Sequence, residues 1–283
     1  CDNDPQARNP QARGPRGSDP QTRREKATAG IAEMVADDGA AESAGEGQGQ
    51  GQGSLGGADA QVALLGELME KRAADGGLFI TFEGGDGSGK TTITRLLAAD
   101  LEGAGFPVLL TREPGGTELG IEVRRLVMHG PDDVDPRTEA LLYAADRAYH
   151  VATMVRPALG ENRVVLGDRY IDSSVAYQGA ARQLGTEEVR RLSEWATGGL
   201  QPDLTLYFDV DADVGLARTG DAPDRLERSG AQFHRAVRDQ YLQMLDQFPQ
   251  RIVLVDASGT IEETYRRVVD ALVAHLSQGG VAP

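Results

Sequence analysis

Lysine is nearly absent from this chain of 283 residues, which has 26 arginines but only three lysines, Lys26, Lys71 and Lys90. Lys90 stands inside a glycine-rich motif that is described below. Arginine presents a planar fork of donors, whereas lysine offers a compact point charge. The lysine in this motif therefore indicates a position where a point charge is required.

Aromatic residues are absent before Phe79, so all fourteen lie in the last 205 residues. A segment without aromatic side chains buries little apolar area, and folding must offset a backbone ordering cost of about 1–2 kcal/mol per residue. We therefore expect residues 1–76 to form a low-complexity, largely disordered leader with a possible short helix at 59–74. Residues 77–278 are expected to form one globular domain.

Cysteine, clustered histidine and long apolar runs are also lacking. The single cysteine, Cys1, excludes an intrachain disulfide and suits a reducing compartment, so we expect a cytoplasmic location. The four histidines form no metal-ligand spacing, and no run of about 18 apolar residues is present to span a membrane. Because the chain begins with Cys1 instead of methionine, we interpret it as a fragment of a longer polypeptide.

Positive charge is in deficit, since the formal net charge is −15. Residues 1–77 account for −5 of this charge and the rest of the chain for −10. Binding to duplex nucleic acid depends mainly on neutralising phosphates. We therefore expect no nucleic-acid partner, although local arginine clusters can still bind one small anion.

A complete phosphate-loop motif, G-x-x-x-x-G-K-[ST], follows a buried apolar run at 78–82 and precedes an amphipathic stretch at 92–101. That strand–loop–helix context is the one the motif requires, because its backbone N–H groups surround a polyphosphate at a helix N-terminus. A chance glycine-rich turn is the alternative. The motif and the residue after it are Gly84, Gly85, Asp86, Gly87, Ser88, Gly89, Lys90, Thr91 and Thr92.

Strands and helices alternate after residue 77. Short apolar runs predict further strands at 108–112, 163–167, 204–210 and 251–256. Helical patterns are expected at about 117–129, 136–159, 186–197, 211–218, 229–247 and 260–276. This order predicts a doubly wound α/β domain of the P-loop NTPase type, with a five-stranded parallel sheet and ligands at the carboxyl ends of the strands.

Three further clusters follow strands or line a helix. Arg-Glu-Pro-Gly-Gly-Thr at 112–117 marks a turn after the second strand, and an exposed ion pair would explain it equally. Asp168 ends the third strand, where a carboxylate can orient Mg²⁺, although a strand-terminal salt bridge is the alternative. Tyr143 and Arg147 share one helix face and could stack on and hydrogen-bond a base, but packing plus a surface charge fits as well.

Together, these motifs resemble bacterial thymidylate kinases. The resemblance rests on the phosphate loop, Arg-Glu-Pro-Gly-Gly-Thr at 112–117, Leu-Tyr-Ala-Ala-Asp-Arg at 142–147, and the Asp-Arg-Tyr to Tyr-Gln-Gly run at 168–179, in that order. It covers roughly residues 78–276. It implies ATP-dependent phosphorylation of dTMP to dTDP with Mg²⁺ bound at Thr91 and Asp168, and a homodimer.

The resemblance also implies roles for single residues. Tyr143, where the family usually has phenylalanine, would stack on thymine, and Arg147 would hydrogen-bond the base. Asp86 and Tyr177 would contact the sugar. The other positions that match the family's substrate site are Arg112, Glu113, Arg124, Arg169, Ser174 and Gln178.

The resemblance implies four catalytic residues, which are Lys90, Asp168, Arg169 and a lid arginine. The family supplies an arginine from either the phosphate loop or the lid, and this loop has none. The lid would be residues 218–228, so Arg218 and Arg225 are the candidates. The alternatives are a kinase for another nucleotide or deoxynucleoside, and a non-catalytic nucleotide-binding module of a larger chain.

Overall fold

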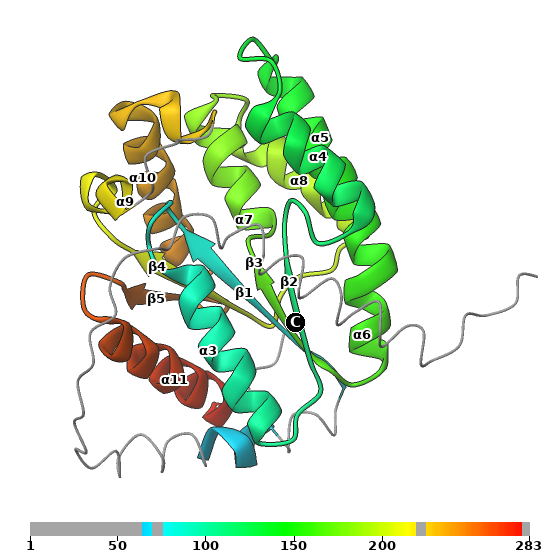
Figure 1. Cartoon of the computed structure of the whole chain (residues 1–283), viewed down its shortest axis with the longest axis vertical. Helices are drawn as coiled ribbons and strands as arrows, with labels where there is room; N and C mark the ends of the chain where they lie inside the picture. The colour runs from blue at the N-terminus through cyan, green and yellow to red at the C-terminus, as the bar shows by residue number, and fades with distance from the viewer. Residues whose placement is uncertain (1–63, 70–75, 219–224, 279–283) are drawn as a thin grey trace, which may run out of the picture. The chain divides into compact units, whose positions relative to one another are not determined.

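The computed structural model describes residues 64–69, 76–218 and 225–278 (Figure 1). Its centre is a parallel sheet of five strands in the order β2-β3-β1-β4-β5. The predicted fold class is therefore confirmed for the described residues. The strands are β1 Leu78–Gly84, β2 Val108–Arg112, β3 Val164–Asp168, β4 Leu204–Asp209 and β5 Ile252–Asp256.

Helices cover both faces of the sheet. They are α3 Lys90–Gly103, α4 Glu118–His129, α5 Pro136–His150, α6 Arg156–Gly160, α7 Ile171–Ser174, α8 Thr186–Thr197, α9 Ala212–Arg218, α10 Ala231–Gln247 and α11 Ile261–Ser277. Two π-helical segments, η1 Val151–Val155 and η2 Val175–Ala181, and a 3₁₀ turn, η3 Glu227–Ser229, complete the described elements.

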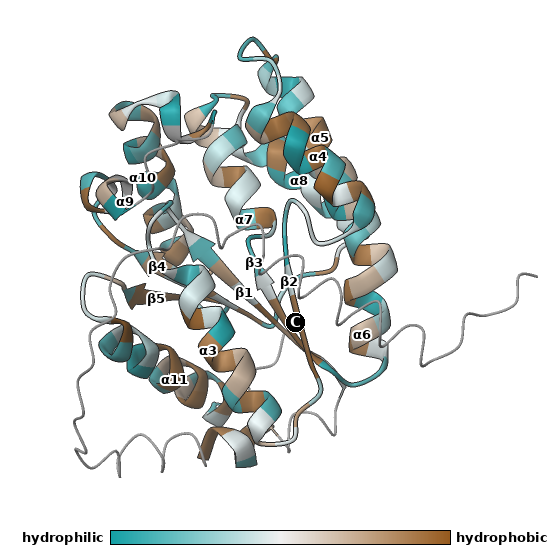
Figure 2. Cartoon of the chain, in the orientation of Figure 1, coloured by the Kyte–Doolittle hydropathy of each residue, from teal (hydrophilic) through white to brown (hydrophobic). Residues whose placement is uncertain are grey.

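Alternate strand residues supply two separate cores. In β1, Ile80 and Phe82 pack in the cluster that includes α3 and α11, whereas Phe79 lies in the cluster on the other face with α4 and α10. This period of two is the geometry of a strand buried on both faces. Figure 2 shows the matching pattern, with strands largely brown and with α3 and α11 divided between brown and teal.

Helix starts follow local capping chemistry. Thr117 accepts the Gly120 N–H at the start of α4, and Asp135 precedes Pro136 at the start of α5. At α11, Thr260 and Glu263 form a reciprocal capping box. These side chains satisfy N–H groups that have no partner within the helix, which explains why the predicted starts agree closely with the structure.

Two parts of the helix prediction differ from the structure. The predicted helix at 136–159 is α5, η1 and α6 in succession, because a π-helical turn interrupts the α-helix. Residues 171–181, for which no helix was predicted, form α7 and η2. Every residue from Tyr170 to Gly179 is buried, so this segment has no amphipathic period by which a helix is recognised.

The possible helix at 59–74 is described only over residues 64–69, which are helical. Leu65 and Met69 are buried in the core cluster with α3 and α11. The rest of this segment and the leader before it lie outside the described residues, so the division at residue 76 stays a prediction. Among the helices that the structure describes, none is both long and apolar enough to cross a bilayer.

Candidate phosphoryl-transfer site

The phosphate loop connects the end of β1 to the start of α3 at the carboxyl edge of the sheet. Gly87 and Gly89 have φ angles of 69° and 82°, a region that glycine adopts without strain. A Cβ on Gly87 would also overlap the carbonyl oxygen of Gly215 in α9. The loop therefore requires glycine at position 87 for both backbone conformation and space.

Lys90 points back into the loop that carries it. Its ammonium group donates to the carbonyl oxygens of Gly84 and Gly85, at 3.1 and 2.7 Å, and to Ser88 Oγ at 3.0 Å. Burial, followed by the nearby charge of Arg169, lowers the pKa of Lys90 to about 8, although the neighbouring carboxylates oppose the shift. A polyphosphate bound in the loop would supply the counter-charge that stabilises this ammonium.

Thr91 and Asp168 bring together a hydroxyl and a carboxylate from two elements. Thr91 Oγ1 donates to Asp168 Oδ2 at 2.9 Å, while Asp168 Oδ1 is buried without a hydrogen-bond partner. Among the described residues, no group of three metal-ligating side chains occurs. Hard oxygen donors in so small a number fit a cation that keeps water and phosphate oxygens as its other ligands, as Mg²⁺ does.

Arg169, just after β3, reaches across to the phosphate loop. It holds a φ angle of 68°, which is rare for a residue other than glycine. Its guanidinium donates to Gly84 O at 3.0 Å and to Asp86 Oδ1 at 2.6 Å, and it lies 5.1 Å above the ring of Tyr177. The Tyr177 hydroxyl in turn donates to Asp86 Oδ2 at 3.3 Å, so three of the predicted site residues meet here.

Glu83, which the sequence analysis did not single out, supports this arrangement from inside the protein. Its buried carboxylate accepts from the Tyr170 N–H at 2.8 Å, Ser173 Oγ at 2.6 Å and the Tyr241 hydroxyl at 2.8 Å. Ser173 Oγ also accepts from Arg169 at 3.2 Å. Burial, followed by the charge of Asp172, raises the pKa of Glu83.

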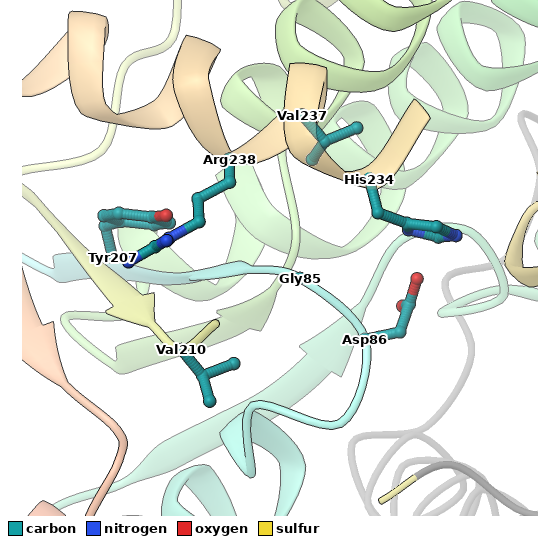
Figure 3. A pocket seen from close by; sticks show the side chains of 7 residues that line it. All are labelled: Gly85, Asp86, Tyr207, Val210, His234, Val237 and Arg238. Atoms are coloured by element: carbon teal, nitrogen blue, oxygen red, sulfur yellow. The ribbon is translucent and has the colours of Figure 1, made fainter. Parts of the chain in front are cut away.

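His234 was also missed, because the four histidines form no metal-ligand spacing in the sequence. Figure 3 shows its ring facing Asp86 across a small cavity of about 20 Å³ between the loop and α10. Burial raises the pKa of Asp86, but the charges of Arg169, Lys90 and His234 outweigh this effect and lower it overall. No local motif connects His234 to the loop, since 148 positions separate it from Asp86.

A second set of buried side chains comes from one face of α5. Glu139, Tyr143 and Arg147 are spaced four residues apart, as predicted for the latter two. Arg147 donates to Glu113 Oε2 at 2.7 Å, Ser174 Oγ at 3.1 Å, Ser193 Oγ at 3.0 Å and Tyr170 O at 2.9 Å. Arg147 is 1% exposed and connects α5 to the turn after β2, to α7 with the residue before it, and to α8.

Beside this face, the turn after β2 begins with Glu113 and is flanked by two arginines, Arg112 at the end of β2 and Arg124 on α4. Glu113 Oε1 lies 2.8 Å from His150 Nδ1, so the Glu113 carboxylate is shared between Arg147 and His150. Arg124 donates to Pro114 O at 3.4 Å, and the side chains of Arg112 and Arg124 both pass Gly115. The turn thus has Arg112 and Arg124 beside the same glycine, while the Glu113 carboxylate faces α5.

The two candidate lid arginines have separate partners. Arg218 donates to Ala257 O, after β5, at 3.2 Å. Arg225 is 6% exposed and donates to Val127 O at 2.9 Å and to Glu139 Oε2 at 2.6 Å. The Arg225 guanidinium therefore binds α4 and α5 in this structure, and the expectation that it supplies charge at the transferred phosphoryl stays a prediction. Residues 219–224 of the expected lid lie outside the described residues.

The five-stranded parallel sheet, with a phosphate loop and its lysine at the carboxyl edge, defines a P-loop nucleotide-binding protein. The thymidylate kinase family model matches residues 82–268. The chain belongs to the thymidylate kinase family.

Individual members of this family are similar over most of their length. A thymidylate kinase of Leifsonia xyli is 57% identical over 190 residues, which are 66% of this chain and 90% of that protein. One from Clavibacter michiganensis is 52% identical over 204 residues, covering 70% of this chain and 97% of that protein. A crystal structure of thymidylate kinase from Ehrlichia chaffeensis is 32% identical with a TM-score of 0.58, and the match covers 70% of this chain and 99% of that one.

Proposed function

We propose that this chain transfers the γ-phosphoryl group of ATP to dTMP, which yields ADP and dTDP for dTTP synthesis. The observation that carries the proposal is the position of Arg169. Its guanidinium lies between the phosphate loop and the acceptor-side residues, bound to Gly84 and Asp86. A cation at this boundary can neutralise charge on both the donor and the acceptor phosphates.

On the donor side, we assign residues Gly84 to Thr92 to the phosphates of ATP, with Lys90 at the β- and γ-phosphates. Thr91 and Asp168 would hold Mg²⁺, which when bound neutralises charge on the phosphate oxygens. The unpartnered oxygen of Asp168 supports this assignment. The Thr91–Asp168 hydrogen bond keeps both groups in place for it.

On the acceptor side, Tyr143 and Arg147 are assigned to the base, together with Ser174 and Gln178. Asp86 and Tyr177 would contact the sugar, and the tyrosine ring would leave little room for a 2′-hydroxyl. The dTMP phosphate would meet Arg112 at the end of β2, Arg124 on α4, and Arg169. The residues assigned to this phosphate and its surroundings are Arg112, Glu113, Arg124 and Arg169.

No side-chain base is required for the reaction, because the attacking phosphate oxygen is already ionised at neutral pH. The protein's contribution is in-line positioning and neutralisation of charge. Lys90 and Arg169 supply this charge from groups whose positions are held by several hydrogen bonds each. Arg218 remains a lid candidate for the transferred group.

The test is ADP release with dTMP, dUMP, dCMP, dGMP, UMP and thymidine as acceptors. We expect the highest kcat/KM with dTMP, and a clear preference for another acceptor would refute the proposal.

Lys90→Met should lower kcat by at least about 100-fold. The variant should not unfold at a lower temperature, because the buried ammonium is costly to desolvate. ATP binding without dTMP-dependent turnover would instead indicate a nucleotide-binding module.

We also propose a homodimer formed through α4 and α5. These two helices pack together and leave large apolar side chains exposed on their outer surface. They are Leu119, Ile121 and Leu126 on α4 and Leu141 and Tyr149 on α5. Burial of such side chains against a second copy would remove them from water.

A cytoplasmic location, proposed from the single cysteine, suits the supply of nucleotides.

A further inference from the structure

Two hydrogen bonds join α5 to the continuous segment formed by α7 and η2, one on each side of Tyr143. Arg147 donates to Ser174 Oγ at 3.1 Å, and Gln178 Nε2 donates to Glu139 Oε1 at 2.8 Å. Glu139 and Arg147 each lie four residues from Tyr143, and Ser174 and Gln178 are four residues apart on the facing segment. The Gln178 side chain is thus held one helical turn from the ring that would stack on the base.

The carboxylate of Glu139 determines which way the Gln178 amide points. An ionised carboxylate only accepts hydrogen bonds, so the amide atom that faces it must be the NH₂ group. In the part of the chain that the structure describes, this is the one protein hydrogen bond of the Gln178 side chain. The carbonyl oxygen is therefore the amide atom left to accept from a ligand.

Two arginines pair with the Glu139 carboxylate. The Glu139 side chain is fully buried and pairs with Arg225 at 2.6 Å and with Arg182 at 3.4 Å. Arg225 is itself fixed at the end of α4, through its side chain to Val127 O and its backbone N–H to Met128 O. A buried carboxylate with such partners cannot rotate freely, so the orientation it imposes on Gln178 is stable.

We propose that Glu139 is a positioning residue for base selection, which holds the Gln178 carbonyl oxygen toward the acceptor base. This inference rests on the proposed function. An acceptor at that point favours a base whose ring nitrogen carries a proton, as thymine and uracil do. Cytosine presents an unprotonated ring nitrogen there, and two acceptors facing each other leave a buried polar group without a partner. Arg225 acts in this arrangement by fixing Glu139.

The test compares Glu139→Gln and Arg225→Gln with the wild type, using dTMP and dCMP as acceptors. A neutral amide at position 139 can donate or accept, so Gln178 can turn over. We expect the ratio of kcat/KM for dTMP to that for dCMP to fall at least about tenfold in Glu139→Gln. The loss should arise mainly from a higher KM for dTMP, with kcat and the KM for ATP within a few-fold of wild type.

Glu187→Gln is the matched control, because Glu187 forms an exposed pair with Arg191 on α8. It should leave the ratio unchanged. Arg225→Gln keeps the Glu139 carboxylate and provides a second measurement if Glu139→Gln does not fold. It should lower the same ratio in the same direction.

The outcomes separate this inference from the proposed function. A wild type that does not phosphorylate dTMP overturns the proposed function. A wild type that prefers dTMP, with folded variants whose dTMP-to-dCMP ratio equals the wild type's, overturns only the inference. Loss of melting temperature with an unchanged ratio would show that Glu139 acts on stability alone, and this result also overturns it.

Discussion

At the scale of single residues, Asp146 is a buried carboxylate in an environment that opposes its charge. It is fully buried on α5, next to Glu113. Burial, followed by the charge of Glu113, raises the pKa of Asp146 from 3.8 to about 7, although His150 and Arg147 oppose the shift. Asp146 therefore keeps its proton in the folded protein at pH values where an exposed aspartate has lost it.

This shift predicts a pH-dependent stability. The folded state binds the Asp146 proton more tightly than the unfolded state does. The stabilisation of the folded state by this proton is therefore fully present below pH 4 and is lost as the pH rises to about 7. Asp146→Asn is neutral at every pH. Relative to wild type, it should gain stability between these values, with an upper limit of about 4 kcal/mol from the shift of about three pKa units.

Urea unfolding of both proteins at pH 4.5, 6 and 8 measures the effect. Asp209→Asn is a useful comparison, because its hydrogen bonds to Arg238 lower the pKa of Asp209 and its stabilisation has the opposite pH dependence. A constant stability difference between Asp146→Asn and wild type across the three pH values would contradict the prediction.

At the scale of elements, the phosphate loop depends on contact with α9. Gly87 has a positive φ angle, and a Cβ added to it would point into the backbone of Gly215. The carbonyl oxygen of Asp86 likewise lies where a Cβ on Gly215 would be placed. The loop and α9 thus approach each other backbone to backbone, which only glycine at both positions allows.

Gly87→Ala should therefore move the loop away from α9. We expect a loss of at least about 2 kcal/mol in stability, since both strain and overlap contribute. We also expect a higher KM for ATP. Gly103→Ala is the control, because Gly103 ends α3 with no atom within 4 Å of an added Cβ. It should be neutral or stabilising by up to about 1 kcal/mol. Equal effects of the two substitutions would refute the explanation.

At the scale of the whole molecule, the exposed apolar residues of α4 and α5 predict self-association. Leu141 is 58% exposed on α5, and Leu119 and Leu126 are exposed on α4, which packs beside it. Leu141→Glu places a charge in the middle of the proposed interface. This variant should sediment as a monomer of 30.1 kDa, whereas the wild type should show twice that mass.

Leu96→Glu tests whether any added surface charge has the same effect. Leu96 is 42% exposed on α3, which covers the opposite face of the sheet. It should leave the wild-type mass unchanged. A monomeric wild type at micromolar concentration, or a dimeric Leu141→Glu variant, would contradict the proposed interface.

The sequence by itself determined the features that depend on neighbours along the chain. The phosphate loop was predictable because eight consecutive residues and their flanking strand and helix carry all of its chemistry. Tyr143 and Arg147 were placed on one face because the helix period requires it. The strand positions followed from short apolar runs, since a sheet buried on both faces needs apolar side chains throughout each strand.

The tertiary structure alone decided which distant side chains meet. Glu83 pairs with Tyr241 across 158 positions, and Arg225 pairs with Glu139 across 86. Neither pair has a spacing that a sequence reveals. A buried carboxylate must find its donors wherever packing brings them, because leaving it unpaired costs more than any local preference. For this reason, the phosphate-loop motif with its flanking strand and helix could be predicted from the sequence, whereas the partners of Glu139 and Arg225 became visible only in the folded domain.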